Sequence, residues 1–270
     1  MRYRLIAADM DGTLLNDQSV ITERTKTAVL RAVEAGALFV AATGRPMRGV
    51  ENVNALFGRD MPFITFNGAV VIMGKSKKVL FSKTLDGPYV REIYTLGTEQ
   101  NVPVALWIGE RLWVSRVCEA TIGYQKISDA EMVVIGDIDS LKNAGVIKML
   151  WIDTPERVKR LQSEMNAHFR GRVNCHISRP SFLEFVSAGA DKAIAMGEIG
   201  KAYGIDRGEM IAVGDSYNDI SMLKYAGLGV AMGNAPDDIK AICRHVTCSN
   251  NEDGVAAVID KYILGKDYDE

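Results

Sequence analysis

Two aspartates near the N-terminus have the type and the spacing needed for catalysis. Asp9 and Asp11 follow the apolar run from Tyr3 to Ala8, which predicts a strand covered on both faces. In an extended segment, side chains two positions apart lie on the same side of the chain. Two such carboxylates repel each other and favour a bound cation, and oxygen ligands without a nearby histidine suit Mg²⁺. One carboxylate can then act as a nucleophile while the other transfers protons.

A second acidic group follows another predicted strand. Met210 to Val213 is apolar, and Asp215 and Asp219 come after it within about one helical turn. In a parallel sheet the loops after two strands can converge, so both groups can reach one ion. Each group also has an ordinary interpretation, because Asp11-Gly12 fits a turn and Asp215 fits a helix cap. Asp219 favours the metal site, because a cap does not need another acid.

Three further residues fit a phosphate site. Thr43 and Gly44 follow the predicted strand from Leu38 to Ala42, and they offer a hydroxyl and a flexible backbone amide for phosphoryl oxygens. Lys192 is predicted to begin a helix, where the macrodipole disfavours a cation unless an anion is nearby. An ordinary Thr-Gly turn and a surface lysine remain alternatives on spacing alone. The three histidines show no metal spacing and no catalytic triad context, so we assign them no catalytic role.

The elements that position these residues alternate between strand and helix. Thr22 and Gly36 fit the N-cap and the C′ position of a helix between them, and Pro46 suits the first turn of another helix. Such alternation predicts a parallel sheet with right-handed crossovers, in which ligands gather at the carboxyl ends of the strands. Asp9, Thr43 and Asn67 all fall at such ends. Further strands are predicted at residues 63–66 and 228–231, and further helices at residues 192–203 and through Met222 and Leu223.

The pattern changes between residues 84 and 187, where strand candidates occur in adjacent pairs. The predicted strands are Val104 to Ile108, Arg111 to Val114, Val146 to Ile152 and Phe182 to Val186. Thr154 is a plausible N-cap for a helix over residues 155–169. This pattern is typical of an inserted α+β domain. The sequence therefore predicts an α/β fold with a discontinuous core domain, residues 1–83 plus 188–270, and an inserted domain, residues 84–187.

The composition restricts the class of partner. The chain has 270 residues and a formal net charge of -2, which gives no general attraction to nucleic acid or to an anionic membrane. No apolar run approaches the roughly 18 residues of a membrane helix. The four cysteines lack the spacing of a zinc set, and we interpret them as reduced thiols. We expect a soluble cytoplasmic protein, a monomer or homodimer, that holds its anionic ligand in a local site.

Taken together, the motifs resemble the haloacid dehalogenase (HAD) superfamily, and within it the Cof-type branch of subfamily IIB, whose members are similar to sugar phosphatases. The resemblance spans nearly the whole chain, and it is the order and spacing of the motifs that make it specific. The matching stretches are Asp9-Met10-Asp11-Gly12-Thr13-Leu14, Thr43-Gly44-Arg45-Pro46, Asn67-Gly68-Ala69, Lys192, Gly214-Asp215-Ser216-Tyr217-Asn218-Asp219 and Ser249-Asn250-Asn251-Glu252-Asp253-Gly254-Val255-Ala256.

The resemblance implies a Rossmann-like core with an inserted α/β cap of the C2 type, and a Mg²⁺-dependent phosphatase that acts on small, sugar-like phosphate monoesters. By this likeness Asp9 is the nucleophile, which forms an aspartyl-phosphate, and Asp11 is the general acid and base. The phosphate-binding residues would be Met10, Thr43, Gly44, Lys192 and Asn218, and the Mg²⁺ ligands Asp9, Asp11, Asp215 and Asp219. Arg45 and cap residues around 104 to 186 would read the leaving group.

Several alternative functions are weighed against this one. A dehalogenase would need neither the second acid nor magnesium, so Asp11 and Asp215 argue against it. A phosphomutase would use the same motifs and differ in water access, so it stays open. A non-catalytic binding module stays open on fold alone, although such a module would be expected to lose Asp9 or Asp11. A nucleotide-binding switch or a dehydrogenase is excluded, because the glycine motifs that they require do not follow the first strand.

Overall fold

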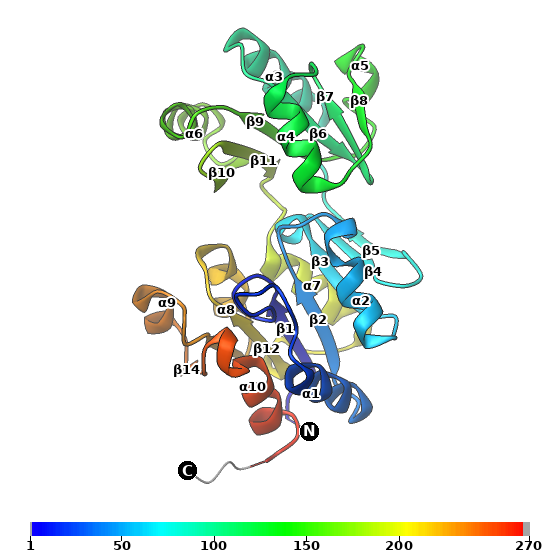
Figure 1. Cartoon of the computed structure of the whole chain (residues 1–270), viewed down its shortest axis with the longest axis vertical. Coiled ribbons are helices and arrows are strands. Elements are labelled where there is room, and N and C mark those ends of the chain that lie inside the picture. Colours follow the sequence, from blue (N-terminus) through cyan, green and yellow to red (C-terminus); the bar gives the residue numbers. More distant parts are fainter. Residues whose placement is uncertain (1, 267–270) are drawn as a thin grey trace. The chain divides into compact units, whose positions relative to one another are not determined.

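A computed structural model describes residues 2–266, and the strand β1, Leu5–Asp9, lies in the interior of its main sheet. All five residues of β1 are buried, as the unbroken apolar run predicts. β1 pairs in parallel with β2, Leu38–Ala42, on one side and with β12, Met210–Gly214, on the other. Figure 1 shows these three strands side by side. The carboxyl ends of three strands from distant parts of the sequence therefore meet at one edge.

Within residues 2–266, the main sheet has eight strands in the order β14-β13-β12-β1-β2-β3-β4-β5. The remaining strands are β3 Pro62–Thr65, β4 Val70–Met73, β5 Val79–Ser82, β13 Leu228–Ala231 and β14 His245–Val246. One feature differs from the predicted parallel sheet, because β4 runs antiparallel to β3. Only four residues, 66–69, connect β3 to β4, and so short a connection can join antiparallel neighbours but not parallel ones.

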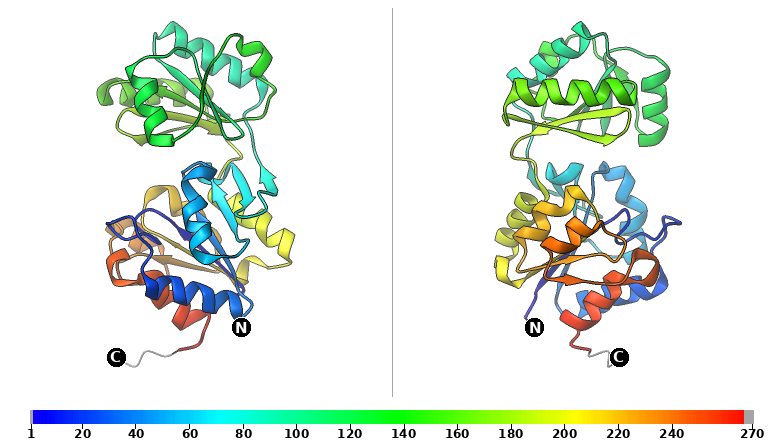
Figure 2. Two further views of the ribbon diagram at one scale, coloured as in Figure 1. Left: turned by 45° about the vertical axis from the view of Figure 1, so that its right-hand side comes forward. Right: turned by 90° about the vertical axis from the view of Figure 1, so that its left-hand side faces the viewer.

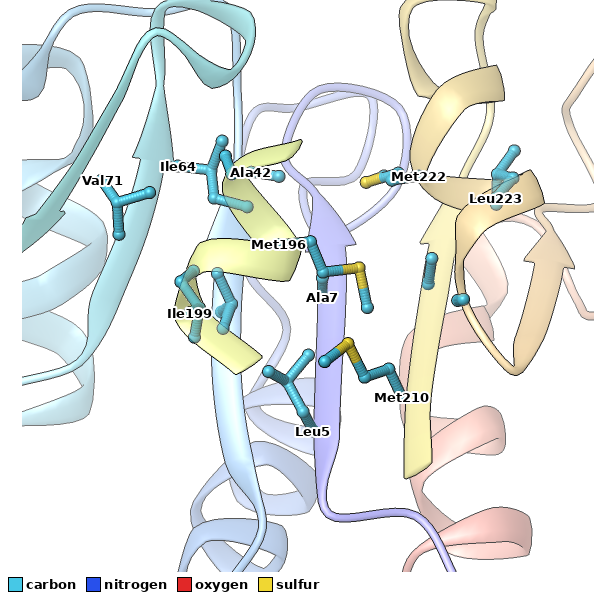
Figure 3. Packing of buried hydrophobic residues seen from close by; sticks show 14 of the residues in the cluster. Leu5, Ala7, Ala42, Ile64, Val71, Met196, Ile199, Met210, Met222 and Leu223 are labelled. Atoms are coloured by element: carbon cyan, nitrogen blue, oxygen red, sulfur yellow. The ribbon is translucent and has the colours of Figure 1, made fainter. Parts of the chain in front are cut away.

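Helices cover both faces of the main sheet. They are α1 Glu23–Glu34, α2 Glu51–Phe57, α7 Lys192–Tyr203, α8 Ile220–Tyr225, α9 Asp237–Ile242 and α10 Gly254–Tyr262. α7 and α8 lie on one face, and α1 and α10 lie on the other (Figure 2). Thr22 caps α1 by accepting a hydrogen bond from the backbone of Thr25, as predicted. Met196 and Ile199 of α7 lie over Leu5 and Ala7 of β1, and this packing fixes the start of α7 close to β1 (Figure 3).

The described chain divides into two compact units. The first comprises the residues up to Arg45, Val50–Phe81 and the chain from Asp191 onward. The second comprises Ser82–Ala190 together with Pro46–Gly49.

Short 3-10 helices occur at Met47–Val50, Phe66–Gly68, Arg207–Glu209, Tyr217–Asp219 and Asn250–Glu252. Among residues 2–266, no helix combines the length and the apolar character that crossing a membrane requires.

The second unit has its own sheet, with the strand order β10-β11-β9-β6-β7-β8. Its strands are β6 Val104–Ile108, β7 Arg111–Val114, β8 Met132–Val134, β9 Val146–Ile152, β10 Val173–Arg179 and β11 Phe182–Ser187. Its helices are α3 Gly87–Glu99, α4 Glu119–Ser128, α5 Ile138–Leu141 and α6 Pro155–Phe169. Apolar residues of α3 and α6 pack on one face of this sheet around Trp151 and Phe185. The predicted strands β6, β7 and β9 and the predicted helix α6 are confirmed.

A buried ion pair stabilises the second unit on the other side of its sheet. Lys148 of β9 donates a hydrogen bond of 2.8 Å to Glu184 of β11, and both side chains are almost fully buried. Burial opposes the ionisation of Glu184, but Lys148 and His176 together outweigh it and lower the pKa of Glu184 to about 2. Because this value lies below the ordinary 4.5, the resulting stabilisation is present above pH 4.5 and is lost as the pH falls towards 2.

We expect this pair to dominate the acid sensitivity of the second unit. Protonation of Glu184 should lower the free energy of unfolding of the wild type by on the order of 3 kcal/mol between pH 5 and pH 2. Glu184→Gln should not show this loss. Denaturant titration followed by tryptophan fluorescence measures it, because the three tryptophans, Trp107, Trp113 and Trp151, all belong to the second unit. Glu131→Gln, at an exposed ion pair, is the control and should keep the wild-type pH dependence. If the free energy of unfolding of Glu184→Gln fell with pH as steeply as that of the wild type, Glu184 would not be the source of the acid sensitivity.

Candidate functional site

The predicted acidic residues meet at the carboxyl edge of the main sheet. Asp9 is the last residue of β1, and Asp215 directly follows Gly214, the last residue of β12. The carboxylates of Asp9, Asp215 and Asp219 each offer an oxygen, and these three oxygens lie within 4.8 Å of one another. Asp9 and Asp219 are buried, while Asp215 is partly exposed. Oxygen donors this close and this poorly hydrated suit a hard divalent cation such as Mg²⁺.

Lys192 lies among the same carboxylates. It begins α7, as predicted, and its side chain is completely buried. Its Nζ donates to Asp9 Oδ1 at 2.6 Å and to Asp219 Oδ1 at 2.7 Å. Burial by itself lowers the pKa of a lysine, but the charges of Asp9 and Asp219 raise the pKa of Lys192 above its ordinary value. The ammonium therefore stays charged, and it supplies a fixed positive charge beside Asp9.

A close backbone approach sets the position of Lys192. Asp191, the N-cap of α7, accepts hydrogen bonds from the backbone of Ala193 and Ile194. Gly68, in the turn after β3, lies against Asp191, and a Cβ on Gly68 would stand 2.2 Å from the Asp191 carbonyl carbon. Gly68 also has a φ of +100°, which other residues rarely adopt. No side chain can replace this hydrogen without moving the start of α7, and with it Lys192.

The cluster holds more negative charge than Lys192 neutralises. Burial raises the pKa of Asp9 to about 8, and the neighbouring carboxylates of Asp219 and Asp215 act in the same direction against Lys192. Burial also raises the pKa of Asp215 to about 6. An aspartate attacks as a carboxylate, so this shift in pKa works against the nucleophile that the sequence predicts. A divalent cation on these oxygens would favour the ionised form.

Asp11 lies apart from the three clustered carboxylates. Its side chain is 55% exposed and forms an ion pair with Arg45. Arg45 Nε donates to Asp11 Oδ2 at 2.9 Å, and Arg45 Nη2 donates to the other carboxylate oxygen. The side chain of Asp11 is therefore not one of the metal-ligand group in this structure, whereas Asp9, Asp215 and Asp219 are. The Arg45 side chain is held by an acid at the site edge.

Thr13 has a role that the sequence did not reveal. It is buried, and its hydroxyl donates to Asp215 Oδ1 at 2.8 Å, which orients that carboxylate. Gly12 brings the two loops together, because it has a φ of +80° and a Cβ there would stand 2.5 Å from Asp215 Oδ2. Thr13 follows Asp11 by two positions, and in the sequence only this place in the motif could have indicated a role for Thr13 in the site.

The predicted phosphate-binding residues lie around the cluster in different ways. Thr43 is buried, and its Oγ1 accepts from the backbone of Arg45 at 3.0 Å. Asn218 Nδ2 donates to Asn67 Oδ1 at 3.1 Å, so the turn after β3 and the loop after β12 are linked. A Cβ on Gly44 would stand 3.1 Å from the Asn67 carboxamide. Asn67 thus connects two of the predicted residues, although the sequence indicated only its place at a strand end and in a stretch that matches the family, without a role of its own.

Of the predicted phosphate-binding residues, Met10 has the least support from the geometry of the site. Its side chain is fully buried among the apolar residues of the core. Its backbone N–H donates to the carbonyl oxygen of Ala42 at 3.0 Å. The amide is thus engaged with the neighbouring strand, and we do not assign Met10 a direct contact with phosphate.

Comparison with known proteins places this site in a wider group. The family described as haloacid dehalogenase-like hydrolase matches residues 6–259. YxeH of Bacillus subtilis, which carries the provisional name of a phosphatase, is 32% identical over 98% of this chain and 100% of its own length. The 5-amino-6-(5-phospho-D-ribitylamino)uracil phosphatase YcsE of Bacillus subtilis is 30% identical, over 97% of this chain and 96% of its own. The solved structure of the HAD subclass IIB sugar phosphatase BT4131 has a TM-score of 0.75 and 26% identity, and the alignment covers 96% of this chain and 98% of that one.

Proposed function

The chain belongs to the haloacid dehalogenase-like hydrolases, as a phosphoric monoester hydrolase of their Cof-type branch, and we propose that it hydrolyses small sugar-like phosphates through a phosphorylated Asp9 with Mg²⁺. The observation that carries the proposal is the group of three carboxylates within 4.8 Å of one another beside the buried Lys192. Phosphoryl transfer depends mainly on in-line positioning and on neutralising negative charge. This group has a nucleophile, a fixed cation and oxygen ligands for a second cation.

In the proposed reaction, a carboxylate oxygen of Asp9 attacks phosphorus and the bond from phosphorus to the leaving oxygen breaks. Asp11 gives a proton to that oxygen, which leaves as an alcohol. Asp11 then takes a proton from water, which attacks the phosphorus and releases inorganic phosphate, and Asp9 is regenerated. Lys192, Thr43, Gly44 and Asn218 would hold the phosphoryl oxygens.

Asp9 and Asp215 would hold Mg²⁺, and Asp219 would support them. The Asp219 carboxylate accepts hydrogen bonds from the backbone amides of Asp215 and Ser216 at 3.1 Å and from Lys192. It therefore orients the loop after β12, in addition to its supporting role at the proposed Mg²⁺ site. A bound Mg²⁺ neutralises charge on the carboxylates and on the phosphoryl group. Thr13 fixes the rotation of Asp215 through the hydrogen bond to Oδ1.

The second unit is proposed as the cap domain, corresponding to residues 84–187, and it would contribute residues that recognise the leaving group together with Arg45. The named substrates of the relatives include a ribitylamino uracil phosphate, and a sugar phosphatase is among the structural neighbours. A phosphorylated sugar or polyol is therefore the substrate class to test first.

The test is release of inorganic phosphate from a panel of sugar, polyol and nucleotide monophosphates, with Mg²⁺ and with chelator. We expect release with Mg²⁺ and none with chelator. In Asp215→Asn, the Mg²⁺ concentration for half-maximal rate should rise roughly 10- to 100-fold, because one ligand loses its charge while the oxygen that accepts from Thr13 is kept. Chelator-resistant release, or an unchanged Mg²⁺ requirement in Asp215→Asn, would contradict the proposal.

A further inference from the structure

The segment from Gly12 to Asp17 carries the chain away from Asp11, and residues from the other end of the chain hold it. Asn234 Nδ2 donates to the carbonyl oxygen of Gly12 at 2.8 Å. Asn250 Nδ2 donates to the carbonyl oxygen of Leu15 at 3.1 Å, and Asn250 is 7% exposed. Two carboxamides more than 200 positions away in the sequence thus bind backbone oxygens one and four positions after Asp11.

A third point of attachment lies at Asp17. Its carboxylate accepts from Asn250 Nδ2 at 3.1 Å and from Asn251 Nδ2 at 2.9 Å. The backbone N–H of Asp17 donates in return to Asn251 Oδ1 at 3.1 Å. These contacts hold the far end of the segment, whereas the bond from Asn234 holds its beginning.

The segment that supplies Asn250 is itself tightly held. The backbone N–H of Asn250 donates to Asn234 Oδ1 at 3.0 Å, so the two carboxamides are coupled. Gly233 and Gly254 allow this part of the chain to approach closely. A Cβ on Gly233 would stand 2.8 Å from the backbone nitrogen of Ser249, and one on Gly254 would stand 2.3 Å from the carbonyl oxygen of Cys248.

The other side of the Gly12–Asp17 segment is joined to the nucleophile. The backbone N–H of Leu14 donates to the carbonyl oxygen of Asp9 at 3.1 Å, and the backbone N–H of Leu15 donates to the carbonyl oxygen of Met10 at 2.8 Å. Asp11 therefore lies in a short loop that begins at the end of β1, is bound by Asn234 directly after Asp11 and is bound by Asn250 at Leu15. Arg45 binds the half-exposed Asp11 carboxylate, and this backbone sets the position from which the Asp11 side chain extends.

We propose that Asn234 and Asn250 are positioning residues, which act through the Gly12–Leu15 backbone to hold Asp11 at the leaving oxygen. The inference rests on the proposed function, in which Asp11 is the general acid and base. Neither carboxamide touches the three clustered carboxylates in the contacts described above. Loss of either should therefore impair proton transfer while phosphate binding and attack by Asp9 continue.

Two substitutions remove the donated hydrogen bonds with almost no change in volume. Asn250→Asp loses the donors to Leu15 and Asp17, and it also places a second carboxylate beside that of Asp17. Asn234→Asp loses the donor to Gly12 but keeps the oxygen that accepts from the Asn250 backbone, so it disturbs the fold less. Asn166→Asp, at an exposed position of α6, is the matched control.

The readout compares two substrates at saturating Mg²⁺. An alkyl phosphate needs a proton on its leaving oxygen, whereas p-nitrophenyl phosphate does not, because its leaving group is a weak base. We expect the single-turnover rate of alcohol release from the best alkyl phosphate to fall roughly 10- to 100-fold in both variants, since a misplacement of about 1 Å can cost that much. For single-turnover release of p-nitrophenolate, which needs no proton and precedes the hydrolysis step that Asp11 also serves, we expect less than about a threefold change. Asn166→Asp should match the wild type.

Equal losses on the two substrates would assign these asparagines a merely structural role, and no loss in either variant would also overturn the proposal. If Asn250→Asp does not fold, as judged by its melting temperature, Asn234→Asp decides alone. Failure of the proposed function gives a different result. In that case the wild type releases no phosphate from any ester, or Asp9→Asn remains active.

Discussion

Replacement of Asp9 by asparagine is expected to lower phosphate release by at least about 1,000-fold without unfolding the protein. A carboxamide keeps the shape of the side chain but cannot form the acyl phosphate. Lys192 would still be paired with Asp219, at 2.7 Å, so the buried ammonium keeps a partner. Phosphate release with Mg²⁺, and mass spectrometry of acid-quenched enzyme for a phosphorylated peptide that contains Asp9, measure the effect.

The same variant should be as stable as the wild type or more stable in the absence of metal. Burial and the neighbouring carboxylates raise the pKa of Asp9 to about 8, which means that folding makes this group harder to ionise. Its replacement by a neutral amide removes that cost, and each kcal/mol gained raises the melting temperature by about 2–4 °C. Asp237→Asn, whose carboxylate is fully exposed, is the control and should change neither activity nor melting temperature. An active Asp9→Asn enzyme would rule out the covalent mechanism.

Lys192→Met is expected to impair both folding and catalysis. Without the ammonium, Asp9 and Asp219 remain buried next to each other with no cation between them, and breaking such a buried pair costs about 3–5 kcal/mol. The loss of a fixed positive charge at the phosphoryl oxygens should lower kcat by about 100- to 1,000-fold. Denaturant titration followed by far-UV circular dichroism measures the stability, and phosphate release measures kcat.

Lys201→Met gives the matched comparison. Lys201 lies on the same helix, α7, but its side chain is 76% exposed and it pairs with Glu198 on the surface. Its removal should leave both the free energy of unfolding and kcat nearly unchanged, because an exposed ion pair contributes little. Mg²⁺ should recover part of the stability that Lys192→Met loses, because a cation that binds only the folded state stabilises it. Equal stability of Lys192→Met and Lys201→Met would mean that the buried contacts of Lys192 contribute nothing.

The local elements were predictable because their signals are local. The unbroken apolar run before Asp9 indicated a strand buried on both faces. Thr22 and Thr154 indicated the starts of two helices, because a threonine oxygen can accept a hydrogen bond from an otherwise unpaired amide of the first helical turn. Lys192 at the start of a helix indicated a nearby anion, because the helix dipole disfavours a lysine there. The structure supplies two, Asp9 and Asp219.

Relations between distant segments were decided only by the tertiary structure. The sequence alone determined which residues have the chemistry and that they fall at strand ends, so Asp9, Thr43 and Asp215 could be named together. That β1 lies between β2 and β12, which brings these ends side by side, depends on long-range pairing that no local pattern encodes. The bond from Thr13 to Asp215 and the hold of Asn234 and Asn250 on the Gly12–Leu15 backbone depend on the same pairing. A hydrogen bond needs its partners within about 3 Å, and only the folded chain brings residues more than 200 positions apart to that distance.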